Sequence, residues 1–255
     1  MLVNTLHREK PALLFGLFLF SLSFTSHAES GIDVVGKMAI GEKTMDLKIR
    51  DRSFSPSFTS LKLSVTGVKG AFFTTLDHEV SIKDAIESDS KGLIFYSRKD
   101  SNLTFGYALS DHLNTFIGYR TGETEAFYTA NNSAFGNSSE GPFIGVSSSY
   151  YLKDTGSIGV SLAIAKLTGK VSLTEPYVDT TAFKVGDSPP ADINGSALGY
   201  SFGISWSSQT SDNMLYSLSA KIQRFEFDDE VVYGGLDLSY EENYNTIAFA
   251  ITKYF

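Results

Sequence analysis

The chain has 255 residues and no cysteine, and its 29 acidic residues outnumber 21 basic ones, for a formal net charge of −8 at pH 7. The acidic balance excludes the basic footprint that nucleic-acid binding needs. Without cysteine, neither disulfides nor thiolate metal sites can form. Beyond the N-terminal region, no segment approaches the roughly 18 consecutive apolar residues of a membrane-spanning helix.

The first 28 residues have the organisation of a secretory signal peptide. Arg8 and Lys10 form a basic patch, residues 12–24 an apolar run, and residues 26–28 (Ser-His-Ala) a cleavage site of small residues. The apolar run is too short for a bilayer, which takes about 20 residues, although a retained anchor is the alternative. We therefore expect a mature chain of residues 29–255, with 19 basic and 28 acidic residues and a formal charge of −9.

Period-two alternation dominates this mature chain. In residues 197–206, large apolar side chains occupy every second position from Leu198 to Trp206, with glycine and serine at most of the positions between. A helix does not sort residues in this way. The same alternation recurs in residues 60–66, 157–165 and 214–223. We expect an all-β domain.

The connections between these segments alternate in length. Short turns at 67–70, 110–113, 153–156 and 208–213 alternate with long polar loops at about 44–57, 83–91, 123–141, 171–195 and 228–242. This punctuation predicts ten strands, at about 32–43, 58–66, 71–82, 92–109, 114–122, 142–152, 157–170, 196–207, 214–227 and 243–255. An eight-stranded alternative would leave residues 29–66 as a plug or tail, and a count above ten stays open. Both termini then lie on the short-turn side.

The small face of the strands favours a closed barrel in lipid over a soluble sandwich. A sandwich exposes its second face to water, where lysine, glutamate and threonine are expected. In the later strands that face carries glycine, serine and alanine, which fit inside a narrow barrel. Aromatic residues on the oily face near the short turns predict an interfacial girdle: Tyr107, Tyr119, Tyr150, Trp206 and Tyr216. We expect a closed antiparallel up-and-down transmembrane β-barrel.

The last strand carries a resemblance to a known class. Ile247, Phe249, Ile251 and the terminal Phe255 alternate on one face. This ending resembles the C-terminal strand of bacterial outer-membrane β-barrel proteins, among them small porin-like and OmpA-like barrels, in which it is the signal read by the barrel-assembly machinery. Lys253 departs from the pattern, although its ammonium can extend to water at the interface. The resemblance implies a Gram-negative outer membrane as the location.

Six charged residues are predicted to lie in the lumen near the long loops. They are Lys62, Asp77, Glu79, Arg98, Asp100 and Arg120, and their charges cancel. Pairing the lumen faces of successive strands predicts Asp77 opposite Arg98, with Arg120 beside Asp100 and Asn102. We interpret the cluster as a salt-bridged plug that satisfies buried charge. The functional alternative is a charged constriction that filters small solutes.

The long loops are acidic, with Glu123, Glu125, Asp228, Asp229, Glu230, Glu241 and Glu242. Acidic runs in loops are usually solvated; divalent-cation bridging to lipopolysaccharide phosphates or to a partner is the alternative. No calcium-loop motif is present, so we nominate no metal site. The mature chain has two histidines, His78 on the outward face and His112 in a short turn, and we expect neither to join a nucleophile–base pair. No catalytic residue or cofactor is nominated.

The sequence thus leaves three functions open. The first is narrow, porin-like passage of small polar solutes. The second is a non-conducting barrel that serves envelope structure and surface contact through its acidic loops. The third is an outer-membrane lipid-modifying enzyme, although we expect no enzyme. The expected partners are outer-membrane lipids, lipopolysaccharide and the barrel-assembly machinery, with no nucleic acid; the solute and the oligomeric state stay open.

Overall fold

The computed structural model describes residues 31–49, 52–89, 92–129, 133–153, 155–173, 192–211, 213–229 and 240–255. These residues form twelve β-strands and no helix. No helix in this part of the chain is long and apolar enough to cross a membrane. The predicted signal peptide, residues 1–28, lies outside the described residues.

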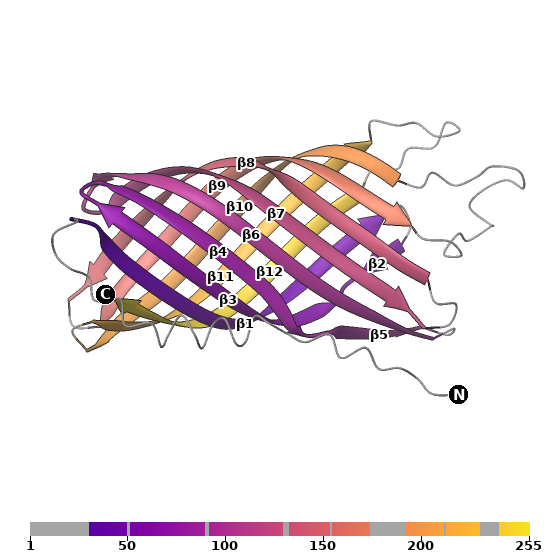
Figure 1. Ribbon diagram of the computed structural model, residues 1–255, viewed down its shortest axis with the longest axis horizontal. Coiled ribbons are helices and arrows are strands. Elements are labelled where there is room, and N and C mark those ends of the chain that lie inside the picture. Colours follow the sequence, from indigo (N-terminus) through magenta and orange to yellow (C-terminus); the bar gives the residue numbers. More distant parts are fainter. Residues whose placement is uncertain are drawn as a thin grey trace, which may run out of the picture.

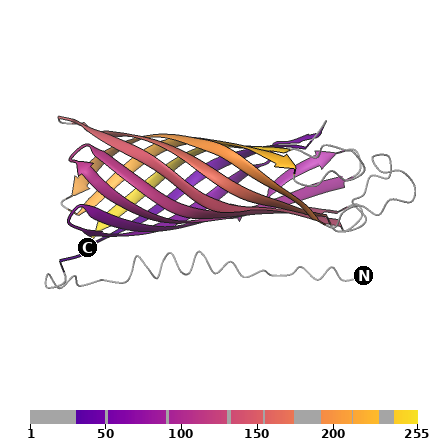
Figure 2. The ribbon, with the colours of Figure 1, turned by 90° about the horizontal axis from the view of Figure 1, so that it is seen from above.

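Ten long strands close into a single barrel (Figures 1 and 2). Each pairs antiparallel with the next long strand, and the first pairs with the last without interruption from Val35–Tyr254 to Ile49–Tyr240. The predicted ten-strand barrel is therefore confirmed. The strands are β1 (Asp33–Ile49), β3 (Ser57–Lys69), β4 (Phe72–Lys83), β6 (Gly92–Ser110), β7 (Leu113–Tyr128), β8 (Ser133–Leu152), β9 (Gly156–Leu173), β10 (Asp192–Ser211), β11 (Met214–Asp229) and β12 (Tyr240–Tyr254).

Two short strands join the barrel where long loops were predicted. β2 (Arg52–Phe54) pairs with β1, and β5 (Ala85–Asp89) pairs with β6. The long strands also extend farther than predicted: β7 ends at Tyr128 rather than near residue 122, and β8 begins at Ser133 rather than at 142. The prediction stopped where outward side chains become polar, although the hydrogen-bonded ladder continues.

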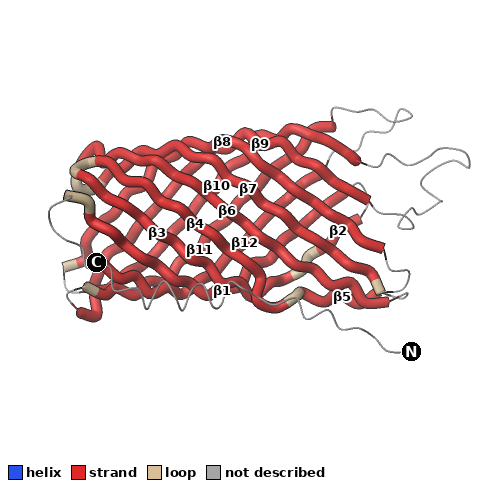
Figure 3. Tube along the Cα trace, viewed as in Figure 1, coloured by secondary structure: helices blue, strands red, loops and turns tan. Residues whose placement is uncertain are grey.

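The two ends of the barrel differ in their connections. At one end, tight turns such as Gly70–Ala71 and Asp111–His112 join neighbouring strands, and the C-terminus lies at the same end (Figure 3). Gly70 has φ 59°, a left-handed conformation that glycine adopts without the steric cost of a side chain. The longer connections lie at the other end. This alternation matches the pattern predicted from the turn residues.

The outward face divides into an apolar band and a polar collar. Along β9, the exposed Leu162 and Ile164 give way to Lys166 and Thr168 toward the long connections. The apolar band comprises Ile40, Val65, Leu76, Leu103, Phe105, Ile117, Ile144, Val146, Leu162, Ile164, Tyr200, Phe202, Ile204, Leu218, Ile222, Ile247 and Phe249, all exposed. The polar collar comprises Lys99, Thr121, Glu123, Ser138, Glu140, Lys166, Thr168, Lys170, Asn194, Arg224, Glu226, Glu241 and Asn245. An exposed apolar ring of this extent suits hydrocarbon rather than water.

Candidate functional site

All six predicted lumen residues occupy inward positions, and four of them join a network centred on Asp100. Arg98 donates two hydrogen bonds to Asp100, from Nη2 to Oδ1 at 2.7 Å and from Nε to Oδ2 at 2.9 Å. Arg120 Nη2 lies 3.3 Å from Oδ1 of the same carboxylate. Bidentate guanidinium–carboxylate contacts are among the strongest polar contacts in proteins.

Lys43, which was not among the predicted lumen residues, completes this network. Its Nζ lies 2.8 Å from Asp100 Oδ2 and 2.7 Å from Glu79 Oε1. The predicted first strand ended at residue 43, so its last residue was given no inward role. The alternation Lys37, Ala39, Gly41, Lys43 on the small face was the signal that could have found it. We call Lys43, Glu79, Arg98, Asp100 and Arg120 the charge layer.

The predicted pairing of Asp77 with Arg98 is wrong. In the observed register Asp77 faces Asn102, and Arg98 faces Thr124 on β7. Arg120 does lie beside Asn102 and Asp100, as predicted. The predicted register assumed that β4 and β6 are joined by a simple loop. The short strand β5 lies between them, so their register does not follow from the number of residues in the connection.

Lys62 and Asp77 form a separate pair on the side of the charge layer nearer the short turns. Lys62 Nζ lies 3.2 Å from Asp77 Oδ2, and Ser64 Oγ donates a hydrogen bond to Asp77 Oδ1 at 2.5 Å. The six predicted residues therefore form two groups rather than one.

An aromatic plug fills the lumen on the other side of the charge layer. Phe227 stacks on Tyr240 at 4.4 Å between ring centroids, with 6° between the ring planes. Met45 and Phe227 are completely buried. The plug comprises Met45, Leu47, Phe58, Leu167, Phe225, Phe227, Tyr240 and Tyr244, all buried at inward positions. No sequence prediction placed an apolar core here. Met45, Leu47 and Tyr240 were assigned to loops, and the other plug residues lie in predicted strands whose inward face was expected to be small and polar.

The guanidinium groups join the two layers. Arg98 lies over the ring of Tyr244 at 4.3 Å, and Arg120 lies over the ring of Phe225 at 4.8 Å. Guanidinium groups stack favourably on aromatic faces, all the more where water is absent. The charge layer thus rests directly on the aromatic plug.

Several contacts cross the lumen between strands that are not neighbours in the barrel. Asn137 on β8 donates a hydrogen bond to Glu242 on β12, and Thr124 on β7 contacts Met45 on β1. Tyr244 donates to the second oxygen of Glu242 at 2.7 Å. Glu242, predicted in a solvated loop, is instead 1% exposed. The walls of the barrel are therefore tied together through its interior at this level.

Tyr240 begins β12 on the collar side of the apolar band, where it stacks in the plug. Burial, with the nearby Glu242 carboxylate, raises the pKa of its hydroxyl. That hydroxyl has no hydrogen-bond partner among the described residues. The plug therefore favours a neutral tyrosine at this position.

The other predicted acidic residues lie mainly on strands. Glu123 and Glu125 belong to β7, and Asp228 and Asp229 to β11, while Glu241 lies on the outward face of β12. Glu123 Oε2 pairs with Lys99 Nζ at 3.0 Å. Glu230 lies outside the described residues. Within the described part, no three His, Asp or Glu side chains converge as a metal site requires.

The girdle residues all face outward, but they do not form one ring. Trp206 packs edge-on against Tyr216 at 5.6 Å and donates from Nε1 to the Thr155 carbonyl at 2.9 Å. Tyr107 and Tyr150 also lie near the short turns. Tyr119 lies at the opposite margin of the apolar band, immediately before the collar. The predicted position of Tyr119 near a short turn is therefore wrong, because β7 starts six residues earlier at Leu113.

The C-terminal residues take the positions that their alternation predicts. Ile247 and Phe249 are exposed on the outward face of β12, and Ile251 follows them. Lys253 places its Nζ 4.9 Å from the ring of Phe255. An assembly-signal role for this strand stays a prediction.

The two described histidines differ from the expectation in one respect. His78 faces outward on β4, but its Nδ1 lies 2.9 Å from Ser101 Oγ on β6. No carboxylate among the described residues bonds His78, and His112 lies in a turn with its ring 6.0 Å from Tyr151. A hydroxyl–imidazole pair without a third group to orient it is an incomplete nucleophilic site. The expectation that no enzyme is present stays untested.

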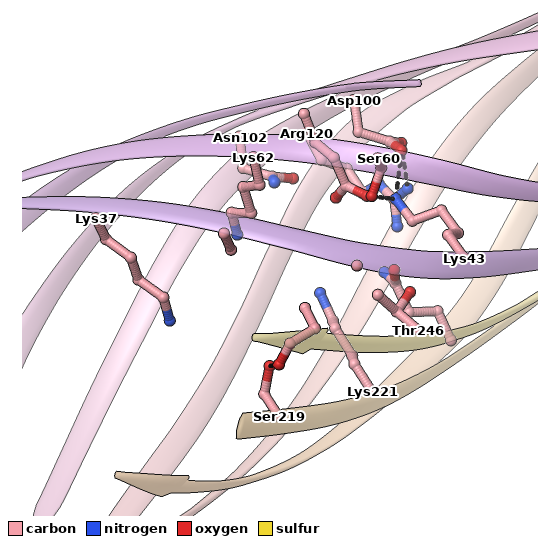
Figure 4. Close-up of a pocket in the computed structure, with 15 residues that line it drawn as sticks. Lys37, Lys43, Ser60, Lys62, Asp100, Asn102, Arg120, Ser219, Lys221 and Thr246 are labelled. Atoms are coloured by element: carbon pink, nitrogen blue, oxygen red, sulfur yellow. Dashed lines mark hydrogen bonds and ion pairs between the residues drawn. The ribbon is translucent and has the colours of Figure 1, made fainter. Parts of the chain in front are cut away.

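A cavity of about 110 Å³ lies next to the charge layer (Figure 4). Its lining extends along β1 from Lys43 to Lys37, toward the short turns. Glu79, Asp100 and Arg120 form part of its lining, together with small residues such as Gly41 and Ala248. Three lysines also reach into it: Lys37, Lys62 and Lys221. The lumen thus has a packed half and a hollow half.

Comparison with known proteins gives a likeness of fold. No family model matches the chain, and no curated protein matches it. The outer membrane protease OmpT from Escherichia coli is 11% identical, with 88% of this chain and 96% of that chain covered and a TM-score of 0.51. The translocator domain of the autotransporter NalP from Neisseria meningitidis is 10% identical, with 96% of each chain covered and a TM-score of 0.49.

At 11% identity, the likeness to OmpT extends to the fold and not to its protease activity. The closed ten-strand barrel, the exposed apolar band and the alternation of short and long connections all agree with that fold. The chain therefore has the fold of bacterial outer-membrane β-barrel proteins.

Proposed function

We propose that the protein is a sealed β-barrel of the Gram-negative outer membrane that acts in envelope structure and surface contact, and does not pass solutes. Of the two leading functions that the sequence left open, the filled half of the lumen supports the second. A porin keeps a water-filled channel through its barrel. Here the charge layer and the aromatic plug occupy successive levels of the interior.

The observation that carries this proposal is the set of contacts that cross the lumen. Arg98 reaches from β6 to the ring of Tyr244 on β12, and Asn137 reaches Glu242 from β8. A polar solute would have to separate these groups and leave their charges unpaired. Breaking a buried ion pair of the charge layer, such as Lys43–Asp100, costs about 3–5 kcal/mol, so spontaneous opening would be rare.

The polar collar is the surface that such a barrel offers outside the lipid. A groove of about 550 Å³ on its outer wall is lined by Lys99, Glu123, Glu140 and Lys170, among others. Mixed charges at this level suit contact with lipid head groups or lipopolysaccharide, directly or through divalent cations. We further propose that β12 carries the signal for the barrel-assembly machinery and that nucleic acid is not a partner.

Single-channel recording on the refolded protein in a planar bilayer tests the proposal. We expect no discrete openings from the natural chain. A variant with Arg98→Ala and Tyr244→Ala should conduct, because it removes both partners of one contact across the lumen. The matched control is Lys99→Ala with Glu123→Ala, which removes a pair from the outer wall.

Discrete openings of the natural chain would support the porin-like function instead. A changed lipid A mass spectrum in cells that produce the protein would support the enzymatic alternative. We expect neither change, and heat-modifiable gel migration would verify that each variant is folded.

A further inference from the structure

The cavity beside the charge layer has too few carboxylates for its cations. Its lining contains five cationic side chains, those of Lys37, Lys43, Lys62, Arg120 and Lys221. The lining contains two carboxylates, Glu79 and Asp100, and both are held within the charge layer. Asp77, next to the cavity, pairs with Lys62. Two ammonium groups therefore remain without a countercharge.

Those two ammonium groups belong to Lys37 on β1 and Lys221 on β11. Neither forms an ion pair or a hydrogen bond with any residue that the structure describes. Both side chains extend toward the same space as Lys62, from two strands that β12 alone separates in the barrel (Figure 4). Lys221 is exposed to the lumen and Lys37 is half-buried, so both ammonium groups are accessible to a ligand, and their like charges repel each other.

A separate donor lies at the same cavity. Arg120 is 6% exposed, and its Nε is buried without a hydrogen-bond partner in the described chain. Its Nη2 contacts Asp100, and its guanidinium plane lies over the ring of Phe225. A buried N–H of this kind costs free energy unless an acceptor reaches it.

We propose that this cavity binds a small oxyanion of the phosphate class. Such an anion would accept hydrogen bonds from the Lys37 and Lys221 ammonium groups and neutralise their charge. Ser219 and Thr246 also line the cavity and supply hydroxyl donors. The volume of about 110 Å³ is several times the roughly 30 Å³ that one water occupies in the liquid.

The ligand is a free anion and not the head group of a lipid. The β1–β12 junction is paired along its length, so the wall has no slot through which acyl chains could pass. A head group inside the lumen would have to bring its hydrocarbon with it. The site also lies on the short-turn side of the charge layer, away from the aromatic plug.

Isothermal titration of the refolded protein with inorganic phosphate, in nonionic detergent at neutral pH, tests this site. We expect saturable binding of one phosphate per chain. Lys221→Met should weaken binding at least tenfold, because it removes a charged hydrogen-bond donor from the site. Lys166→Met, a lysine exposed on the outer collar, is the matched control and should bind as the natural chain does.

Thermal unfolding gives a second readout. Phosphate at constant ionic strength should raise the Tm of the natural chain and leave that of Lys221→Met unchanged. Without phosphate, the variant should melt above the natural chain, because methionine removes an unpaired cation. Lys37→Met serves as the second variant if Lys221→Met does not show heat-modifiable migration.

Absence of saturable phosphate binding, or equal binding by both cavity variants and the natural chain, would overturn the site. Equal weakening by Lys166→Met would show surface attraction instead and would also overturn it. The outcome is independent of channel recording, because a sealed barrel and a conducting barrel can each hold an anion here.

Discussion

The two halves of the barrel interior are built from different residues. On the short-turn side, the lumen face of β9 and β10 is alanine, serine and glycine, and the interior holds a cavity. On the side of the long connections, the same strands place Leu167 and Ala197 against a packed aromatic core. The outward faces change in step, from an apolar band to a polar collar.

This difference indicates that the outer wall of the barrel meets lipid along one part of its axis and water along the other. Within the apolar band, the outer wall is stabilised by lipid, and the interior need only be narrow. Beyond the band, water surrounds the wall, and the strands need an apolar interior as a soluble barrel does. The aromatic plug is therefore the core of the part that projects from the membrane.

The largest expected effect follows from removing the centre of the charge layer. Asp100→Asn leaves Lys43, Arg98 and Arg120 without their shared carboxylate, so we expect the free energy of unfolding to fall by about 3–5 kcal/mol. Urea titration in detergent, followed by Trp206 fluorescence, measures it. Glu123→Gln removes an exposed pair and should cost at most about 1 kcal/mol. Equal losses would mean that the buried charge layer stabilises the fold no more than an exposed pair on the outer wall does.

A smaller loss is expected from a cavity in the plug. Phe227→Ala removes a fully buried ring and should cost about 3 kcal/mol, near the lower end for such changes because the site borders the long connections. Combined with Phe225→Ala, it should also raise bilayer current. Phe105→Ala, in the apolar band, should leave the lumen and the current unchanged. A silent double variant would show that the charge layer alone seals the barrel.

Gly169 offers a finer probe of packing at the same level. A Cβ at this position would lie 2.0 Å from the Tyr240 hydroxyl and 2.5 Å from the ring of Phe227. Gly169→Ala should therefore cost about 1–3 kcal/mol, since rigid rings must shift. Gly67→Ala is the control, because its Cβ would meet only Ile32 at 3.8 Å. If both substitutions have the same effect in urea titration, the plug is loosely packed.

Sequence patterns predicted the part of the barrel that meets lipid better than the part that meets water. The alternation from Leu198 to Trp206 has a period of two with one purely apolar face, so strand, face and order could be predicted. Beyond the band, residues such as Phe225 and Phe227 alternate with Glu226 and Asp228, and the apolar face changes sides. The predicted strand at 214–227 includes both phenylalanines, but with the lipid-facing frame their inward side was not recognised as an apolar core.

The charge layer was only partly predictable for a different reason. The alternation along the strands placed Arg98, Asp100 and Arg120 on the inward face, because their neighbours in sequence face outward. Their partners depend on register, and register across β4 and β6 depends on β5, which no local pattern indicated. The role of Lys43 required both the length of β1 and a contact three strands away.

The smallest expected effect concerns pH and the plug. Burial and Glu242 raise the pKa of Tyr240, so the folded chain holds this proton more tightly than the unfolded chain, whose tyrosines titrate near about pH 10. Stability from this group is therefore complete below that pH and is lost as the pH rises above it. Tyr240→Phe keeps the ring stacked on Phe227 and should reduce the alkaline fall in Tm above about pH 10. At neutral pH it should leave the Tm unchanged or slightly raised, because the removed hydroxyl has no described partner.

Tyr107→Phe, on the outward face, is the control. If the plots of Tm against pH for both variants run parallel to that of the natural chain, the plug is not sealed against water and hydroxide.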